Sequence, residues 1–201
     1  MNEKFFDLRK EKQNRMINAG LHIFALNGYH HASTDEIVKE AGISKGLLFH
    51  YFGSKAGYYA FLYSYINRYA LLEYSSEIRD GRRDLFTLHR DLLRVEAGLM
   101  EQYPYLFLYL ESLRSETDPE ALASLDELDR SVPEFYHDVL QQADATPYLR
   151  IDNEARLDDI IHYIKIGLMR ERLQGSGTQI ADYTKVMDRY LTSLQRMASK
   201  L

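Results

Sequence analysis

The sequence contains no cysteine, and no apolar run in it approaches the ~18–20 residues that a membrane-spanning helix requires. The absence of cysteine excludes disulfide bonds, thiolate metal sites and thiol nucleophiles. The segment MNEKFFDLRKEKQNR is charged and lacks the apolar core of a signal peptide. We therefore expect a cytoplasmic protein that does not enter a membrane.

Enzyme motifs are absent as well. The sequence has no H-E-x-x-H, G-x-S-x-G or G-x-G-x-x-G pattern and no phosphate-binding loop with its lysine. The adjacent pair His30-His31 precedes Asp35-Glu36, but neighbouring histidines in a turn rarely converge on one metal ion. We expect no catalytic residues, no metal and no cofactor.

The net charge of −5 argues against a protein that coats nucleic acid, but the charge is unevenly distributed. The first 55 residues hold eight Lys and Arg against six Asp and Glu, whereas the remainder holds 17 against 24. A mildly basic head on an acidic body is compatible with a small nucleic-acid-binding module joined to a domain with another task.

Strand signals are almost absent, and the apolar periodicity is helical nearly throughout. We predict an all-α protein of about nine helices: an N-terminal three-helix helix-turn-helix domain, residues 1–54, and a larger C-terminal bundle, residues 55–201, connected by the helix 55–74. Pro133 should kink or restart the helix expected over 120–143. The other helices are expected at 9–26, 34–41, 45–52, 85–102, 105–114, 153–173 and 178–199.

The stretch AGISKGLLFHYFGSK, residues 41–55, lies between two short capped helices. A short helix, a turn containing Gly42 and a second short helix form a helix-turn-helix, in which the second helix enters the DNA major groove. Ile43 and Leu48 should face inward, Ser44 should cap the second helix, and Gly46 should allow close approach to the groove. We predict as DNA-binding residues Thr34, Ser44, Lys45, Gly46, Leu47, His50, Tyr51 and Lys55.

The segment TDEIVKEAGISKGLLFHYFGSK resembles the DNA-binding domain of the TetR-like transcriptional regulators, whose pattern is approximately T-x-x-I-A-x-x-A-G-V-S-x-G-x-[LI]-[YF]-x-[HY]-F-x-x-K. Two positions depart from it: the family often has threonine where this chain has Leu47, and tyrosine where it has Phe49. The matching residues are Thr34, Ile37, Ala41, Gly42, Ser44, Gly46, Phe49, Tyr51, Phe52 and Lys55.

The resemblance implies a homodimer that binds a palindromic DNA operator, most often as a repressor, and is released by a small-molecule effector. Two alternatives remain open from the sequence. One is a small-molecule-binding or enzymatic helical protein with a vestigial helix-turn-helix, and the other is an adaptor that binds a protein partner through its exposed aromatic surface.

The last two expected helices carry apolar residues at steps of three and four, as in a helix-helix seam. We predict that they form a four-helix dimer interface, although they could instead pack only within their own subunit. The residues concerned are Leu157, Ile161, Ile164, Leu168, Tyr183, Met187, Tyr190 and Leu194.

Aromatic residues are abundant beyond residue 57, and aromatic walls with a few polar groups are typical of ligand cavities. The same residues could equally form an aromatic core. The predicted effector is apolar or amphiphilic, and the candidate pocket residues are Tyr65, His89, Phe107, Tyr136, His162 and Tyr163.

Overall fold

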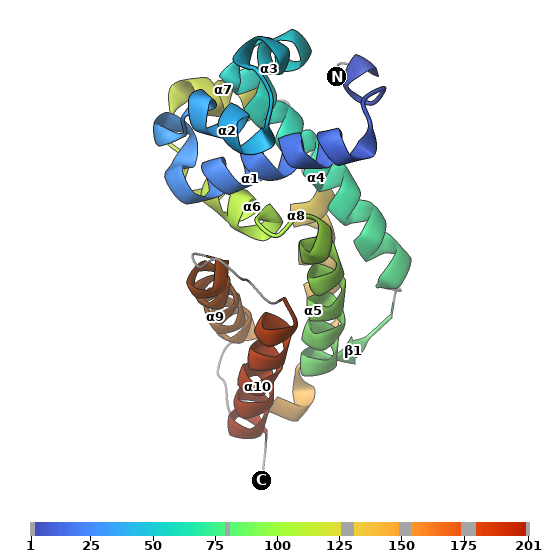
Figure 1. Ribbon diagram of the computed structural model, residues 1–201. Coiled ribbons are helices and arrows are strands. Elements are labelled where there is room, and N and C mark those ends of the chain that lie inside the picture. The colour runs from blue at the N-terminus through green and yellow to red at the C-terminus, as the bar shows by residue number, and fades with distance from the viewer. Residues whose placement is uncertain (1–2, 79–80, 126–130, 149–153, 174–179, 200–201) are drawn as a thin grey trace. The chain divides into compact units, whose positions relative to one another are not determined.

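The computed structural model describes residues 3–78, 81–125, 131–148, 154–173 and 180–199 (Figure 1). These residues form ten α-helices, two short 3-10 turns and one parallel pair of two-residue strands, β1 (Arg83–Asp84) and β2 (Ala143–Asp144). The all-α prediction is therefore confirmed. Among the described helices, none combines the length and apolarity needed to cross a bilayer.

Packing divides the chain into two compact units, each built from two segments. Unit 1 comprises Met1–Tyr69 and Gln102–Arg130, and unit 2 comprises Ala70–Glu101 and Ser131–Leu201. These units are defined by packing alone, and they cut the chain elsewhere than the functional boundary predicted between residues 54 and 55. That functional boundary stays a prediction.

Unit 1 holds the N-terminal helices, with α1 packed against both α2 and α6. Gly20 of α1 permits this core to close, because a Cβ there would lie 2.3 Å from the Tyr58 hydroxyl oxygen. The Tyr58 hydroxyl itself donates to the Met16 carbonyl. The elements are a 3-10 turn (Glu3–Phe5), α1 (Lys10–His31), α2 (Thr34–Ala41), α3 (Lys45–Phe52), the first part of α4 (Lys55–Glu77), α6 (Leu106–Arg114) and α7 (Pro119–Leu125).

The first helix breaks where the sequence predicts a stop. Gly28 has φ 67° and ψ 176°, a conformation that interrupts α1, and one further turn continues to His31. A left-handed φ of this kind favours glycine over residues with a side chain. The predicted end at residue 26 is thus a kink followed by a short extension.

Unit 2 contains the end of α4 and the helices α5, α8, α9 and α10, of which α9 packs against α10. Its interior includes the fully buried side chains of Tyr74, Leu92 and Tyr183. The elements are α5 (Leu85–Gln102), α8 (Ser131–Gln141), a 3-10 turn (Thr146–Tyr148), α9 (Glu154–Leu173) and α10 (Ile180–Ala198).

Two helices, α7 and α8, lie within the range where one kinked helix was expected, which raises the described count from nine to ten. Pro133 stands in the first turn of α8. Proline is tolerated there because the backbone N–H it lacks would have no partner within the helix. Residues 126–130, which would show whether the chain restarts or kinks between the two helices, lie outside the described residues.

Candidate DNA-binding surface

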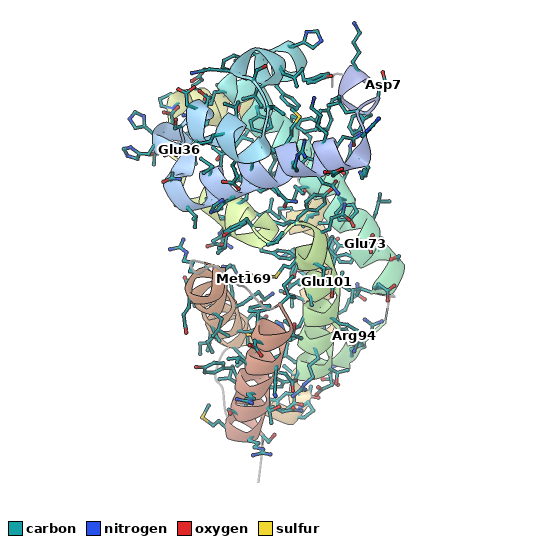
Figure 2. The ribbon with its side chains drawn as sticks, in the orientation of Figure 1. Asp7, Glu36, Glu73, Arg94, Glu101 and Met169 are labelled. Carbon is teal, nitrogen blue, oxygen red and sulfur yellow. The ribbon has the colours of Figure 1, made fainter. Side chains whose placement is uncertain are left out.

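The first helix of the motif, α2, begins at the predicted cap. The Ser33 hydroxyl accepts hydrogen bonds from the backbone N–H groups of Asp35, at 3.2 Å, and Glu36, at 3.5 Å. Both residues are acidic and stand in the first turn, where the positive end of the helix dipole favours them. Figure 2 labels Glu36 on this helix. The start of α2 is therefore fixed by local sequence alone.

The turn between α2 and α3 depends on Gly42. Its φ of 64° and ψ of 43° place it in the left-handed region, and its N–H donates to the carbonyls of Lys39 and Val38. Ser44 then caps α3, because its hydroxyl accepts from the backbone N–H of Leu47 at 3.2 Å. A left-handed glycine and a serine cap within three residues fix where one helix ends and the next begins.

The two faces of α3 follow the predicted division. Leu48 is completely buried and Ile43, in the turn, is half-buried. On the opposite side, Lys45 and His50 are exposed, together with Ser44 and Gly46. The remaining candidates on this face, Leu47 and Tyr51, are half-buried, as is Thr34 at the start of α2.

Lys45 is held by a neighbour from the other helix of the motif. Its ammonium group lies 3.0 Å from the Asp35 carboxylate, and both side chains are exposed. An exposed pair of this kind contributes roughly 0–1 kcal/mol to stability and exchanges readily with other partners. The pair therefore leaves Lys45 able to meet a phosphate or a base.

Gly46 has no internal reason to be a glycine. It lies inside a helix, is exposed, and has no described atom within 4 Å of the position that a Cβ would take. Gly46 is the second residue of α3, and glycine is a poorer helix former than alanine, by up to about 1 kcal/mol in a helix interior. The position therefore leaves open space through which another molecule can approach the backbone of α3.

An aromatic residue near the N-terminus supports α3, a contact that was not predicted from the sequence. Phe5 is fully buried, and its ring packs edge-on against Tyr51, with centroids 5.9 Å apart. It also lies 5.3 Å from the Phe52 ring and 4.9 Å from the Phe61 ring. The pair Phe5-Phe6 in a charged segment was the signal available. Phe5 thus fixes how far Tyr51 can project.

Lys55, predicted to bind a phosphate, makes contacts within its own chain. Its ammonium group lies 4.4 Å from the centroid of the Tyr29 ring and 3.5 Å from the His30 carbonyl oxygen. Burial lowers the pKa of Lys55, and the acidic side chains of Asp118, Glu120 and Glu116 oppose that effect. Lys55 is half-buried by these contacts, and its contact with a DNA phosphate stays a prediction.

Those acidic residues form a carboxylate cluster in the loop after α6 and the first turn of α7, defined by Glu116, Asp118 and Glu120. Glu120 accepts a hydrogen bond from the Tyr29 hydroxyl at 2.7 Å, and burial together with this bond raises the Tyr29 pKa. Asp118 lies 3.4 Å from Nδ1 of His30. The cluster therefore contacts the end of α1, next to the helix-turn-helix.

The six predicted pocket residues fall into both units. Tyr65 and Phe107 belong to unit 1, where the Tyr65 hydroxyl lies 2.9 Å from that of Tyr103. In unit 2, His89 is buried and its Nε2 lies 2.8 Å from the Asp158 carboxylate. The other three also belong to unit 2, with Tyr136 and His162 half-buried and Tyr163 72% exposed.

The eight predicted interface residues divide by exposure. Five of them are buried inside the protomer, as the alternative of packing within one subunit anticipated: Leu157, Ile161, Leu168, Tyr183 and Met187. Ile164 and Leu194 are half-buried and Tyr190 is 45% exposed. Only these three can present substantial surface to a partner.

Comparison with known proteins agrees with this geometry. The family model described as "Bacterial regulatory proteins, tetR family" matches residues 16–59. A Bacillus subtilis protein named as the uncharacterized HTH-type transcriptional regulator YuxN is 45% identical over 60 residues, which are 30% of this chain. The chain spans about a fifth of the length of that relative, since the match covers 20% of it.

Solved structures share the fold over nearly the whole chain. A TetR family regulator from Chloroflexus aurantiacus has a TM-score of 0.64 at 21% identity, covering 99% of this chain and 98% of its own. A TetR family regulator from Agrobacterium tumefaciens has a TM-score of 0.59 at 18% identity, covering 94% and 98%. At these identities the likeness shows the fold, while the sequence match shows the family of the DNA-binding region. The DNA-binding region, residues 16–59, is thus that of the TetR family of bacterial regulatory proteins, and the chain has the fold of solved TetR family regulators.

Proposed function

We propose that this protein is a cytoplasmic homodimeric regulator, most simply a repressor, that binds a palindromic operator and leaves it when a small effector binds. The observation that carries the proposal is the outer face of α3, where a capped helix presents exposed Lys45 and His50 on either side of an open Gly46. Such a face is suited to the floor of a major groove.

On this face, some groups would position the helix on the DNA backbone, and others would read the base sequence. Backbone N–H groups at the start of α3 and the Lys45 ammonium suit phosphate oxygens, which fix the docking position. Leu47 suits a thymine methyl group and His50 suits an acceptor on a base edge. Gly46 allows the helix backbone to approach the groove wall more closely than any other residue would.

A single eight-residue helix reads few base pairs, so the proposal requires two copies. Exposed and half-buried residues of α9 and α10 supply a surface for pairing, here called the outer stripe. The most exposed apolar side chains on it are Tyr163, at 72%, and Met197, at 66%. The stripe comprises Ile160, Tyr163, Ile164 and Gly167 on α9, and Tyr190, Leu194 and Met197 on α10.

The spacing along α9 is that of one helix face, because residues 160, 163, 164 and 167 recur at steps of three and four. Gly167 is exposed and has open space around it, so another helix can approach closely there. Two helices from each subunit would form a four-helix interface. The outer stripe thereby replaces the five buried residues as the proposed contact surface.

In the dimer, the two α3 helices would have to lie about one DNA turn apart, ~34 Å, to enter successive major grooves. An effector that binds better to a dimer with another spacing would weaken operator binding, and the operator would weaken effector binding by the same factor. Regulation then needs no contact between the effector and DNA.

The test is recovery of the operator from genomic DNA fragments by the purified protein, followed by titration of the recovered site at several salt concentrations. Specific binding should weaken with a log–log slope of about −0.9 for each phosphate contacted. Recovery of no preferred sequence, or a slope near zero, contradicts DNA recognition by this chain.

A further inference from the structure

A buried carboxylate lies in the interior of unit 2. Glu96 of α5 is completely buried, and its Oε1 receives the Lys165 ammonium of α9 at 2.6 Å. The same oxygen accepts from the hydroxyl of Tyr136 and, at 3.4 Å, from that of Tyr74. The two tyrosine hydroxyls lie 2.9 Å apart. One oxygen of the carboxylate therefore collects three donors from α4, α8 and α9.

The other oxygen, Oε2, is buried and has no hydrogen-bond partner among the residues that the structure describes. The hydroxyl of Tyr183 on α10 is also buried and likewise has no hydrogen-bond partner within the described part of the chain. Burial, and then the nearby charge of Glu96, raise the Tyr183 pKa, so this phenol keeps its proton and can donate it. Each unsatisfied buried polar atom costs roughly 1–3 kcal/mol.

The surroundings of the carboxylate are aromatic. The ring of Tyr74 stacks on Phe135 with centroids 5.6 Å apart, and it meets Tyr136 edge-on at 5.1 Å. The Lys165 ammonium lies 5.6 Å from the centroid of the Tyr136 ring. Tyr136 of α8 and Lys165 of α9 are half-buried, so these two members of the network keep some contact with solvent.

Resting on the proposed function, we propose that the effector is an electrically neutral molecule with an apolar body and a hydroxyl group, and that this hydroxyl donates to Glu96 Oε2. A hydroxyl is also an acceptor, which the Tyr183 hydroxyl can use. The aromatic rings of Tyr74, Phe135 and Tyr136 receive the apolar body. Of the residues predicted from the sequence to line a pocket, Tyr136 is the one that belongs to this network.

The charge of the site decides between neutral and ionic ligands. Glu96 and Lys165 already balance each other, so a cationic ligand would leave a surplus positive charge in the interior. An anion would face the oxygen Oε2 and be repelled. A neutral donor satisfies Oε2 and leaves the balance unchanged.

Substitution of Glu96 by glutamine should invert the selectivity of the site. Three donors converge on Oε1, so the amide carbonyl of Glu96→Gln must occupy that position. The amide NH2 then stands where Oε2 was and presents donors instead of an acceptor. A purely structural role of Glu96 would change stability without inverting ligand preference.

The experiment is calorimetric titration of the DNA-free protein with four probes of similar size: para-butylphenol, its methyl ether para-butylanisole, para-butylbenzylamine and para-butylbenzoate. The wild type should bind the phenol about tenfold more tightly than the ether and the two charged probes. Glu96→Gln should prefer the ether, and Tyr183→Phe, which removes a donor that the oxygen of either probe can accept, should weaken binding of the phenol and of the ether several-fold. Glu101→Gln, at an exposed glutamate of the same helix α5, is the matched control for Glu96→Gln and should behave as the wild type.

The proposal is overturned if the wild type binds none of the probes, binds phenol and ether equally, or prefers a charged probe. It is also overturned if the advantage of the phenol survives unchanged in Glu96→Gln, or if Tyr183→Phe binds the phenol as tightly as the wild type does. Should Glu96→Gln not fold, Tyr183→Phe decides. Because no DNA is present, a failure here leaves operator binding to be judged by its own experiment, and the reverse is equally true.

Discussion

Tyr29 and Glu116, 87 residues apart in the sequence, are joined by a hydrogen bond of 2.9 Å from the backbone N–H of Tyr29 to Glu116 Oε2. The break of α1 at Gly28 precedes that N–H directly. The other carboxylate oxygen accepts from the N–H groups of Thr117 and Asp118, both at 2.9 Å. One side chain thus orders its own loop and holds the end of the helix that precedes the DNA-binding motif.

Glu116→Gln should destabilise the protein by about 1–2 kcal/mol at pH 7, because an amide NH2 would face backbone donors. Partial burial acts to raise the Glu116 pKa, but the N–H groups of Asp118, Tyr29 and Thr117 outweigh it, and the pKa lies below its ordinary value. A lowered folded-state pKa gives stability that is present above about pH 4.3, the ordinary glutamate value, and is lost as pH falls through the folded pKa.

Urea unfolding of Glu116→Gln and wild type between pH 7 and pH 3 measures this difference. The deficit of the variant should shrink as the pH falls below about 4.3. Glu101, an exposed carboxylate of α5 labelled in Figure 2, provides the control Glu101→Gln, which should stay within ~0.5 kcal/mol of wild type. A deficit that is constant with pH shows that the Glu116 charge plays no part.

Gly46→Ala should have opposite effects on folding and on DNA binding. It should stabilise the protein by roughly 0.5–1 kcal/mol, since alanine is the better helix former and nothing obstructs its methyl group. Operator affinity should fall at least tenfold, because the methyl group meets the groove. Thermal unfolding and fluorescence anisotropy measure the two effects.

Gly98→Ala is the matched control for this experiment. Gly98 is also helical, exposed and surrounded by open space, but it lies on α5. Its substitution should stabilise the protein similarly and leave operator affinity unchanged. Unaltered DNA binding by Gly46→Ala means that α3 does not approach the duplex.

Tyr163→Asp and Leu194→Asp should each convert the dimer into monomers at micromolar concentration, because a buried unpaired carboxylate is costly in an apolar interface. Analytical ultracentrifugation measures the change. Leu72, on α4, is 70% exposed and outside the outer stripe, so Leu72→Asp should remain dimeric. Dimers in both stripe variants place the interface elsewhere.

Lys55→Ala should weaken binding to all DNA sequences alike and reduce the salt slope by about one unit if Lys55 leaves its position over the Tyr29 ring to meet a phosphate. Lys185→Ala, an exposed lysine of α10, should change neither quantity. The titrations are those of the operator at several salt concentrations. An unchanged slope in Lys55→Ala shows that the lysine serves its internal contacts only.

The features predicted well from the sequence are local ones. The caps at Ser33 and Ser44 and the left-handed Gly42 depend on residues within three positions of each other, so a short stretch contains the whole cause. The contacts of Phe5 with Tyr51 and of Glu116 with Tyr29 join distant segments, so the spacing of residues along the sequence does not predict them.

The apolar periodicity of α9 and α10 also predicted only part of how these helices pack. It marks residues on a packed helix face but does not distinguish packing within a subunit from packing between subunits. Leu157 and Tyr183 proved to be core, while Tyr163, assigned to the pocket, is exposed on the outer stripe. Burial in three dimensions was needed to separate the two sets. The Glu96 network was not predicted from the sequence, because a single glutamate in an amphipathic helix is typical of a surface residue.

Sequence selection with variants of the exposed face of α3 shows whether that face reads DNA bases. Wild type, Leu47→Ala and His50→Ala would each select binding sites from a random duplex library. We expect a palindromic site for the wild type and, for each variant, a preference lost at one symmetrical position by ~1–3 kcal/mol. Identical profiles for all three proteins, or no enriched site, would contradict this expectation.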